Sequence, residues 1–404
     1  MKILHTADWH LGKRLDFFSR MEEQSEVMDE ICTIADREAV DMVIVAGDLF
    51  DAFNPSTEAI DLLYKTLKKL TNDGKRAVIA IAGNHDSPAL IDAPDTLARA
   101  CGIIMIGYPQ AVVAPMELPH FSLTKTVPGF FELKFNHLDY PVRLLHTAYA
   151  NEVRLKTYLG EDNKAISLNQ LLKENWQAIA DEHCDENGVN LLTTHLFLMN
   201  KQGEIQEEPE GERSIRIGNA DLIDAASIPS QIQYTALGHL HSYQNLGTEE
   251  KPIVYASSPL AFSFSETSHQ KYVVIIETEP NQNAKLERIP LQSGRELKRK
   301  AFDNVDEAVS WLEENPSTLV ELTMESDTFL SANDRKRILQ AHSGIIHLIP
   351  KVKQDNASAT PQKTIDLNQN MEELFVAYFK SKKDGQAPSE EINQLFQEIL
   401  NYQR

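Results

Sequence analysis

Cysteine and long apolar runs are both scarce in this sequence, and each absence excludes a class of protein. The chain has 404 residues but only three cysteines, Cys32, Cys101 and Cys184, with no CxxC pair. This sparse, odd count argues against a disulfide framework and is typical of a reducing compartment. No apolar run approaches the roughly 18 residues of a membrane span. Asp8 and His10 interrupt the apolar N-terminus before a signal sequence could form. We therefore expect a soluble cytoplasmic protein.

Positive charge is also in short supply. The chain carries 39 Lys and Arg against 60 Asp and Glu, which gives a formal net charge of −21. Taken alone, this balance argues against nucleic-acid binding, because contacts to phosphate depend on Lys and Arg. Bound metal ions or local basic clusters would weaken that objection. The length favours two or three domains rather than one core.

Apolar, β-branched runs alternate with amphipathic segments over the first part of the chain. Because helices connect the strands, we expect parallel pairing in a sheet that is covered on its faces, with a site at the carboxyl ends of the strands. We predict strands at 2–7, 42–46 and 77–82 and helices at 20–39 and 57–71, the latter starting at Pro55-Ser56.

Short strands dominate after about residue 110 and predict a second sheet packed on the first. We expect these strands at 142–147, 190–194, 233–237, 253–257 and 271–277, with a helix around 167–183. The polar, Gly- and Pro-containing segment 199–218 is typical of a surface loop.

The composition changes after Glu277 and predicts a small α+β domain over residues 278–353. Its first residues, 278–285, are polar and resemble a linker. The expected elements are strands at 286–291, 318–324 and 345–352 and helices at 304–315 and 331–342, with Asp303 or Asn304 and Ser331 as N-caps.

The last 41 residues, 364–404, follow a polar linker at 354–363 and predict two amphipathic helices. The first has Leu367, Met371 and Phe375 on one face, and the second has Ile392 and Phe396. Two short helices bury little area alone, so we favour docking onto helices of another protein. The alternative is that they pack back on the main body.

Five short segments carry the chemistry, and each follows an apolar run. They are Asp8-Trp9-His10, Gly47–Asp51, Gly83–Asp86, His195 and Gly238–His241. Carboxylate and amide oxygens suit hard divalent ions, and imidazole suits manganese, iron or zinc. Enough ligands are present for two metals side by side, a recurring solution to phosphate-ester hydrolysis. The seven candidate ligands are Asp8, His10, Asp48, Asn84, His195, His239 and His241. His195 is the least certain of them, because His146 also ends a strand.

The ordered set DxH, GDxxD, GNHD, H and GHxH resembles the calcineurin-like metallophosphoesterase superfamily. The opening MKILHTADWHLGKRL and the pair GDLFD and GNHD are similar to the SbcD family of bacterial nuclease subunits, and the similarity covers the whole length. The resemblance implies an α/β (α+β) fold, an αββα sandwich of two packed mixed sheets, with a small capping domain and a helical tail. It assigns the nuclease domain to 1–277, a DNA-capping domain to 278–353, a linker to 354–363 and a partner-docking helical hairpin to 364–404.

Carried over residue by residue, the resemblance implies a two-metal DNA phosphodiesterase, with manganese or magnesium as the cofactor. His85 would be the catalytic histidine, Asp51 would orient it, and Asp86 would have a supporting role. The implied activities are double-strand exonuclease and single-strand or hairpin endonuclease in DNA end processing, repair and recombination. The implied ligands are Asp8, His10, Asp48 and His241 for one metal and Asp48, Asn84, His195 and His239 for the other.

The resemblance also implies partners. These are DNA, a second copy of the nuclease chain in a homodimer formed through helices near 55–100, and an SbcC-type SMC-like ATPase in a heterotetramer with two copies of each chain, at the nucleoid. Lys13 and Arg14 directly follow the first motif, which makes them the first candidates for DNA contacts. The remaining candidates are Arg20, Arg213 and Arg216 and the basic run at 295–300.

Other substrates remain open at this stage, because one metal site serves several. A protein Ser/Thr phosphatase would have Asp-Arg-Gly and Gly-Asn-His-Glu where this chain has Asp51-Ala52-Phe53 and Asp86. A phosphodiesterase for small substrates would need neither the small domain nor the tail. A scaffold that only binds metal is disfavoured by the presence of both His85 and Asp51.

Overall fold

The computed structural model describes residues 1–159, 164–200, 222–326 and 330–352, with six single positions in the tail. The chain divides into two compact units, Met1–Lys351 and Val352–Arg404. In the second unit, the Phe375 and Phe396 rings stack with their centroids 4.0 Å apart. The two predicted tail helices otherwise lie outside the described residues, as does most of the loop at 199–218. Within the described part of the chain, no helix is long and apolar enough to cross a membrane.

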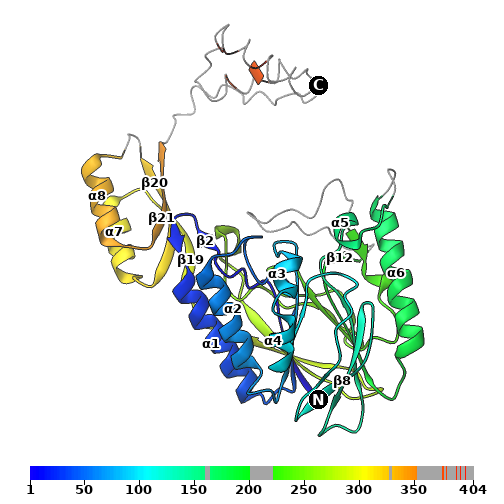
Figure 1. Cartoon of the computed structure of the whole chain (residues 1–404). Coiled ribbons are helices and arrows are strands. Elements are labelled where there is room, and N and C mark those ends of the chain that lie inside the picture. Colours follow the sequence, from blue (N-terminus) through cyan, green and yellow to red (C-terminus); the bar gives the residue numbers. More distant parts are fainter. Residues whose placement is uncertain are drawn as a thin grey trace. The chain divides into compact units, whose positions relative to one another are not determined.

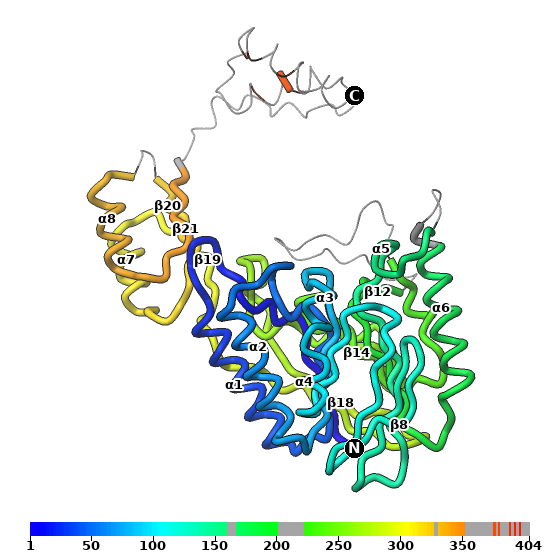
Figure 2. Tube along the Cα trace, viewed as in Figure 1, coloured from blue at the N-terminus to red at the C-terminus, as the bar shows by residue number. Residues whose placement is uncertain are grey.

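A six-stranded sheet forms the first layer of the larger unit, and its parallel part follows the predicted alternation of strands and helices (Figure 1). Strand β4 (Met42–Val45) is buried along its whole length, as expected for a strand covered on both faces. Helices α1 (Met21–Arg37) and α2 (Thr57–Leu70) lie side by side over this sheet (Figure 2). The Ser56 hydroxyl caps α2 by accepting from the Ala59 amide. The sheet order is β18 (Lys285–Pro290), β17 (Tyr272–Glu277), β1 (Lys2–Thr6), β4 (Met42–Val45), β5 (Ala77–Ile81) and β6 (Ile103–Ile106).

An eight-stranded mixed sheet forms the second layer. Its central strands are parallel, and both flanks are antiparallel. Residues of both sheets, such as Ile44 and Leu191, belong to one buried apolar cluster, so the sheets pack face to face. Helix α6 (Lys164–His183) covers the second sheet, where Trp176 Nε1 donates to Thr147 Oγ1 at 2.9 Å. The order is β15 (Gln244–Asn245), β16 (Ile253–Tyr255), β14 (Tyr234–Gly238), β11 (Val189–His195), β10 (Val142–Thr147), β9 (Phe130–Phe135), β8 (Phe121–Val127) and β7 (Met116–Glu117). This arrangement confirms the predicted packed α/β sandwich.

The remaining elements of the larger unit are short and lie between these strands and helices. They are β2 (Arg14–Leu15), β3 (Phe18–Ser19), α3 (Pro88–Asp92), α4 (Asp95–Ala100), α5 (Glu152–Leu155), β12 (Phe197–Met199), β13 (Leu222–Asp224) and the 3₁₀ helices η1 (Ala225–Ser227) and η2 (Phe264–Glu266).

The small α+β domain has a three-stranded sheet and two helices with their own apolar core. The Asn304 side chain caps α7 by accepting from the amides of Asp306 and Glu307, which decides between the two expected caps. Ser331 caps α8 as predicted. The elements are β19 (Glu296–Phe302), α7 (Val305–Glu314), β20 (Thr318–Ser326), α8 (Ala332–Ala341) and β21 (Ile345–Val352).

One strand was assigned to the wrong sheet. We expected 286–291 to open the small domain, but β18 is the edge strand of the six-stranded sheet and pairs antiparallel with β17. The polar segment 278–285, expected as a linker, is mostly the hairpin connection between these two strands. An exposed edge strand carries polar side chains, so its sequence resembles a linker followed by a new domain. The sheet of the small domain begins instead at the charged strand β19.

Candidate metal centre

The five predicted segments meet at one place, where strands of both sheets end. Asp8 and His10 follow β1, Asp48 follows β4, and Asn84 and His85 follow β5. His195 is the last residue of β11, and His239 and His241 come directly after β14. Carboxyl ends of parallel strands are where open α/β sheets place their sites. All of these residues except the partly exposed Asn84 are buried.

The backbone at this place is strained. Asp8, His10, Asp48 and His239 have φ values of 54°, 44°, 48° and 112°, which residues with a side chain rarely adopt. Each such conformation costs about 1–3 kcal/mol and persists only where the surroundings impose it. Main-chain hydrogen bonds do so here, because the Asp8 amide donates to the Gly47 carbonyl at 3.0 Å and the His10 amide to that of Asp48 at 2.9 Å. Strain of this kind clusters at functional sites.

Glycines allow the segments to approach one another closely. A Cβ atom at Gly83 would lie 2.1 Å from Asp48 Oδ1, and one at Gly238 would lie 1.8 Å from the Ala46 carbonyl oxygen. Neither glycine has a positive φ, so the left-handed backbone conformation is not the reason for glycine here. Both are required because another segment occupies the space of a side chain.

Three imidazoles turn Nδ1 toward an oxygen outside the centre. His195 Nδ1 is 2.8 Å from the Ala46 carbonyl oxygen, and His85 Nδ1 is 2.7 Å from that of Asp51. His241 Nδ1 lies 3.5 Å from Glu266 Oε1. A carbonyl oxygen only accepts, so Nδ1 carries the proton in His195 and His85. In the neutral rings, the Nε2 atom then has a lone pair to offer to an ion.

Acceptor atoms converge at two neighbouring positions. At the first, His10 Nε2 lies 3.1 Å from His241 Nε2 and 3.6 Å from Asp48 Oδ2. The Asp8 carboxylate offers an oxygen within 4.8 Å of both imidazoles. At the second, His195 Nε2 lies 3.3 Å from Asp48 Oδ2 and 3.0 Å from Asn84 Oδ1. Lone pairs that face one another need a proton or a cation between them, and this donor set of carboxylate, amide and imidazole fits divalent metal ions.

The pKa values of the buried carboxylates also indicate a site for a cation. Burial raises the pKa of Asp8 to about 7, although His195 and His241 oppose this shift. Burial would also raise the pKa of Asp48, but the nearby His195 holds it well below its usual range. Burial lowers the pKa of His195, and the Asp48 carboxylate outweighs this effect and raises it to about 9. The cluster therefore holds positive charge strongly, whether as a proton or as a metal ion.

His85 lies beside the first position, with its ring centroid 4.8 Å from that of His10. Its amide donates to Asp48 Oδ1 at 2.9 Å. We expected Asp51 to orient His85, and the contact runs through the main-chain carbonyl of Asp51. The Asp51 carboxylate lies instead 3.1 Å from Lys13 Nζ.

Supporting residues hold the loops. The Asp86 carboxylate accepts from the amides of Leu49, Phe50 and Gly83 at 2.8–3.0 Å, so it joins the second and third segments. Arg154 donates to the carbonyls of Gly83 and Asp86 at 2.8 Å each. Lys271 Nζ donates to the His241 carbonyl at 2.8 Å. Sequence reasoning missed Arg154, Glu266 and Lys271, because they lie outside the motifs that they support.

His195, and not His146, lies near Asp8 and Asp48. The buried His146 ring packs against Phe131 with centroids 5.6 Å apart. Burial lowers its pKa to about 3. His146 therefore belongs to the space between the sheets.

The candidate DNA contacts differ in how exposed their side chains are. Arg14 is exposed, and the Lys13 side chain is 12% exposed beside Asp51. Arg20 was wrongly included, because it is 1% exposed and donates to Glu23 Oε2 at 2.6 Å, so it presents no guanidinium to a phosphate. Arg213 and Arg216 lie outside the described residues.

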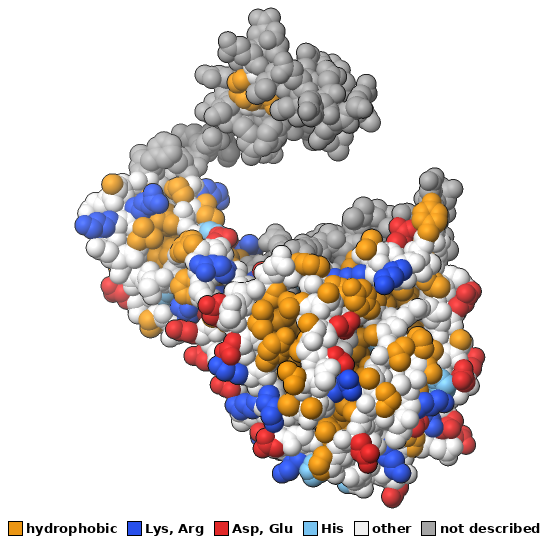
Figure 3. All heavy atoms as spheres, in the orientation of Figure 1, with side chains coloured by type: hydrophobic (Ala, Val, Ile, Leu, Met, Phe, Trp, Pro, Cys, Tyr) orange, Lys and Arg blue, Asp and Glu red, His pale blue; other side chains and the backbone are white. Residues whose placement is uncertain are grey.

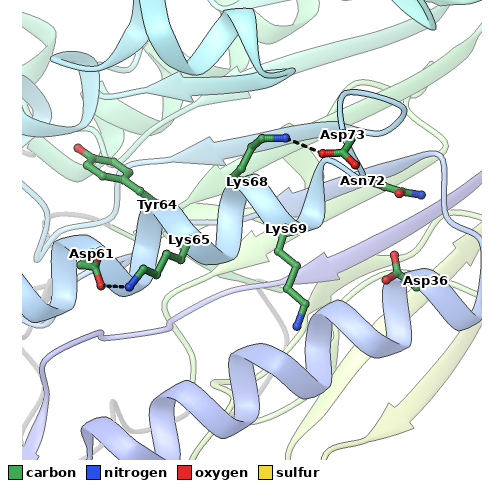
Figure 4. Close-up of a pocket in the computed structure, with 8 residues that line it drawn as sticks. All are labelled: Asp36, Asp61, Tyr64, Lys65, Lys68, Lys69, Asn72 and Asp73. Carbon is green, nitrogen blue, oxygen red and sulfur yellow. Dashed lines mark hydrogen bonds and ion pairs between the residues drawn. The ribbon is translucent and has the colours of Figure 1, made fainter.

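A hollow on α1 and α2 is lined by several lysines (Figure 4). Lys65 lies 2.6 Å from Asp61, Lys68 lies 3.1 Å from Asp73, and Lys69 lies 2.7 Å from Asp29. Because each ammonium has a carboxylate partner, this hollow is not a basic surface for nucleic acid.

Comparisons with known proteins agree with this geometry. The sequence model of the calcineurin-like phosphoesterase family matches residues 1–243. The SbcD subunit of the nuclease SbcCD from Bacillus subtilis (strain 168) is 33% identical over 408 residues, covering 99% of this chain and 98% of the relative. The proteins of the same name in Staphylococcus epidermidis and Staphylococcus saprophyticus are 30% and 32% identical over 297 residues, covering 74% of this chain and 71% and 70% of the relatives. The chain therefore belongs to the calcineurin-like phosphoesterase family and, within it, to the SbcD nucleases.

Proposed function

We infer that this chain is a metal-dependent nuclease that hydrolyses phosphodiester bonds of DNA. The observation that carries this inference is the convergence of buried acceptor atoms at two neighbouring positions that share Asp48. Two such positions suit a pair of divalent ions, which would supply Lewis acidity for the attack of water on phosphorus and neutralise charge on the phosphate.

The two positions share Asp48 and differ in their other ligands in this proposal. Asp8, His10, Asp48 and His241 hold one ion, and Asp48, Asn84, His195 and His239 hold the other. The mixture of imidazole and oxygen ligands favours manganese over magnesium, which prefers an all-oxygen environment.

His85 is the proposed proton donor. Its Nδ1 stays on the Asp51 carbonyl, so a second proton on Nε2 is the one that it can give to the leaving sugar oxygen. The hydrogen bond from its amide to Asp48 Oδ1 would keep His85 close to the residues that would hold the ions.

Partners follow from the relatives, whose name refers to a complex called SbcCD. We propose that segment 364–404 binds an SbcC-type ATPase and that the small domain, from Glu296 to Val352, contacts DNA beside the centre. A homodimer would use the face of α2 to α4, where hydrophobic side chains gather (Figure 3). Leu97 in α4 is 77% exposed and Tyr64 in α2 is 37% exposed.

The test is a cleavage assay on labelled duplex, hairpin and single-stranded DNA with added Mn²⁺. Cleavage should stop when a chelator is added and should be lost in Asp48→Ala, whereas His120→Gln at an exposed position should cleave like the wild type. Hydrolysis of a small chromogenic phosphodiester without cleavage of any DNA would favour a small-substrate phosphodiesterase instead.

A further inference from the structure

Glu266 lies behind His241 and is 3% exposed. Its Oε1 accepts from the amides of Phe262 and Ser263 at 3.1 Å each and faces His241 Nδ1 at 3.5 Å. A carboxylate at Nδ1 favours the tautomer that leaves the Nε2 lone pair for an ion. Nε2 of the same ring lies 3.1 Å from His10 Nε2, inside the centre.

Lys271 fixes both the carboxylate and the main chain of His241. The buried ammonium donates to Glu266 Oε2 at 2.5 Å, to the His241 carbonyl at 2.8 Å and to Ser258 Oγ at 2.9 Å. Its three protons are therefore all used. Burial lowers the pKa of Lys271, and the Glu266 carboxylate opposes this shift.

A buried ion pair is a poor source of stability, because both charges lose their hydration. A carboxylate against a ligating histidine, however, fixes the ring and raises its basicity toward the metal. This pair is therefore explained better by what it does for His241 than by what it adds to folding.

Glu266 lies in the short 3₁₀ helix η2, which also contacts the small domain. Phe264, the first residue of η2, belongs to one buried cluster with Leu297, Leu319 and Ile346 of the small domain. Glu266, the last residue of η2, contacts His241. One short helix thus joins the packing of the small domain to a candidate metal ligand.

We propose that Glu266, held by Lys271, is a positioning residue for His241, and that η2 makes metal affinity depend on how the small domain packs on Phe264. This rests on the proposed function, in which His241 binds one of the two ions.

The experiment measures Mn²⁺ affinity of the full chain by calorimetry. Glu266→Gln keeps the size of the side chain and removes its charge, so affinity should fall about 10–100-fold, the usual effect of losing such a partner. Glu296→Gln changes an exposed carboxylate on β19 and serves as the matched control with wild-type affinity. Wild-type affinity in a folded Glu266→Gln would overturn the proposal.

A second variant covers the case in which Glu266→Gln leaves Lys271 uncompensated and fails to fold. Glu266→Gln with Lys271→Met removes both charges at similar volume, a change that proteins often tolerate. It should also bind Mn²⁺ about 10-fold more weakly or worse, and wild-type affinity would refute the role of the carboxylate.

A separate pair of variants tests the link to the small domain. Phe264→Ala should weaken Mn²⁺ binding, although by less than Glu266→Gln does. Leu339→Ala, an apolar truncation on the exposed side of α8, should leave Mn²⁺ binding unchanged. Equal affinity in these two variants would overturn the link. A wild-type chain that binds no Mn²⁺ would overturn the proposed function itself, whereas a wild type that binds it and matches Glu266→Gln would overturn only this inference.

Discussion

The metal centre and the attachment of the small domain are held in different ways. Hydrogen bonds to the main chain of neighbouring loops fix the centre. The bond between Asp8 and Gly47 is one of those that impose the strained φ values of the ligands, and the Asp86 and Arg154 side chains also bind the loops. Side chains fix the small domain through the apolar cluster around Phe264 and through charged contacts to α1. Substitution of a candidate ligand should therefore change the chemistry of the centre without moving its loops, because the main-chain bonds and the Asp86 contacts remain. A single substitution at Phe264 or Glu23 can instead loosen the small domain.

The charged contacts to α1 show how local that attachment is. Glu23 accepts from the Arg295 amide at 2.8 Å and from its Nη2 at 3.0 Å. Glu30 accepts from the amides of Gln292 and Ser293 at 2.9 Å and 2.8 Å. Two glutamates on one helix thus hold the segment that leads into the small domain.

The largest effect is expected from Asp48→Asn. This change keeps the shape of the side chain but removes the charge shared by both positions, so Mn²⁺-dependent cleavage should fall to background. The fold should persist, because the main-chain bonds around residue 48 remain. Cleavage rates and circular dichroism of the variant check both statements, and cleavage at the wild-type rate would contradict the shared role.

His85→Gln should lower kcat by about 10²–10⁴-fold, the usual contribution of a general acid. Because His85 is not among the proposed ligands, Mn²⁺ affinity should stay at the wild-type value. Single-turnover cleavage and calorimetry on the same preparation separate the two quantities. A parallel loss of both would mean that His85 acts as a ligand and not as a proton donor.

Glu23→Gln tests how the small domain is attached to α1. It leaves the buried guanidinium of Arg20 without its carboxylate, so the free energy of unfolding should fall by about 3 kcal/mol, as for other broken buried pairs. Mn²⁺ affinity should change little, since the Phe264 contact remains. Urea unfolding measures the loss, with Glu22→Gln on the exposed side of α1 as control. Equal stability of the two variants would show that these charges do not hold the connection.

The smallest effect concerns pH. Partial burial lowers the pKa of His347, but its hydrogen bonds to Asp16 and Glu321 outweigh this effect and raise it. A raised pKa in the folded state stabilises the protein at low pH, and this contribution is lost as the pH rises through that pKa. The side chain is 37% exposed, so screening should keep the contribution below about 1 kcal/mol. His347→Gln should therefore cost more stability at about pH 5.5 than at about pH 9, and the reverse order would contradict the assignment.

Local sequence patterns predicted much of the fold. The apolar runs that became β4 and β5 and the caps at Ser56 and Ser331 depend on neighbouring residues, which a sequence displays directly. Strand β18 was misplaced because pairing with β17 is a choice between sheets that its own polar side chains do not record.

The candidate site was also only partly predictable from the sequence. The motifs identified which residues meet, because each one ends an apolar strand. Glu266 and Arg154 could not be found, because their carboxylate and guanidinium contact loops that are distant in sequence. Arg20 was misjudged for the converse reason, since a basic residue near a motif resembles a phosphate contact until its buried partner Glu23 is known.

The most direct test of the account is the number of Mn²⁺ ions that the wild-type chain binds, counted by calorimetry on the protein used for DNA cleavage. Acceptor atoms that converge at two positions around Asp48 predict two ions per chain and no cleavage after a chelator removes them. Cleavage that persists in the chelator, or a chain that binds no Mn²⁺ and still cleaves DNA, would contradict it.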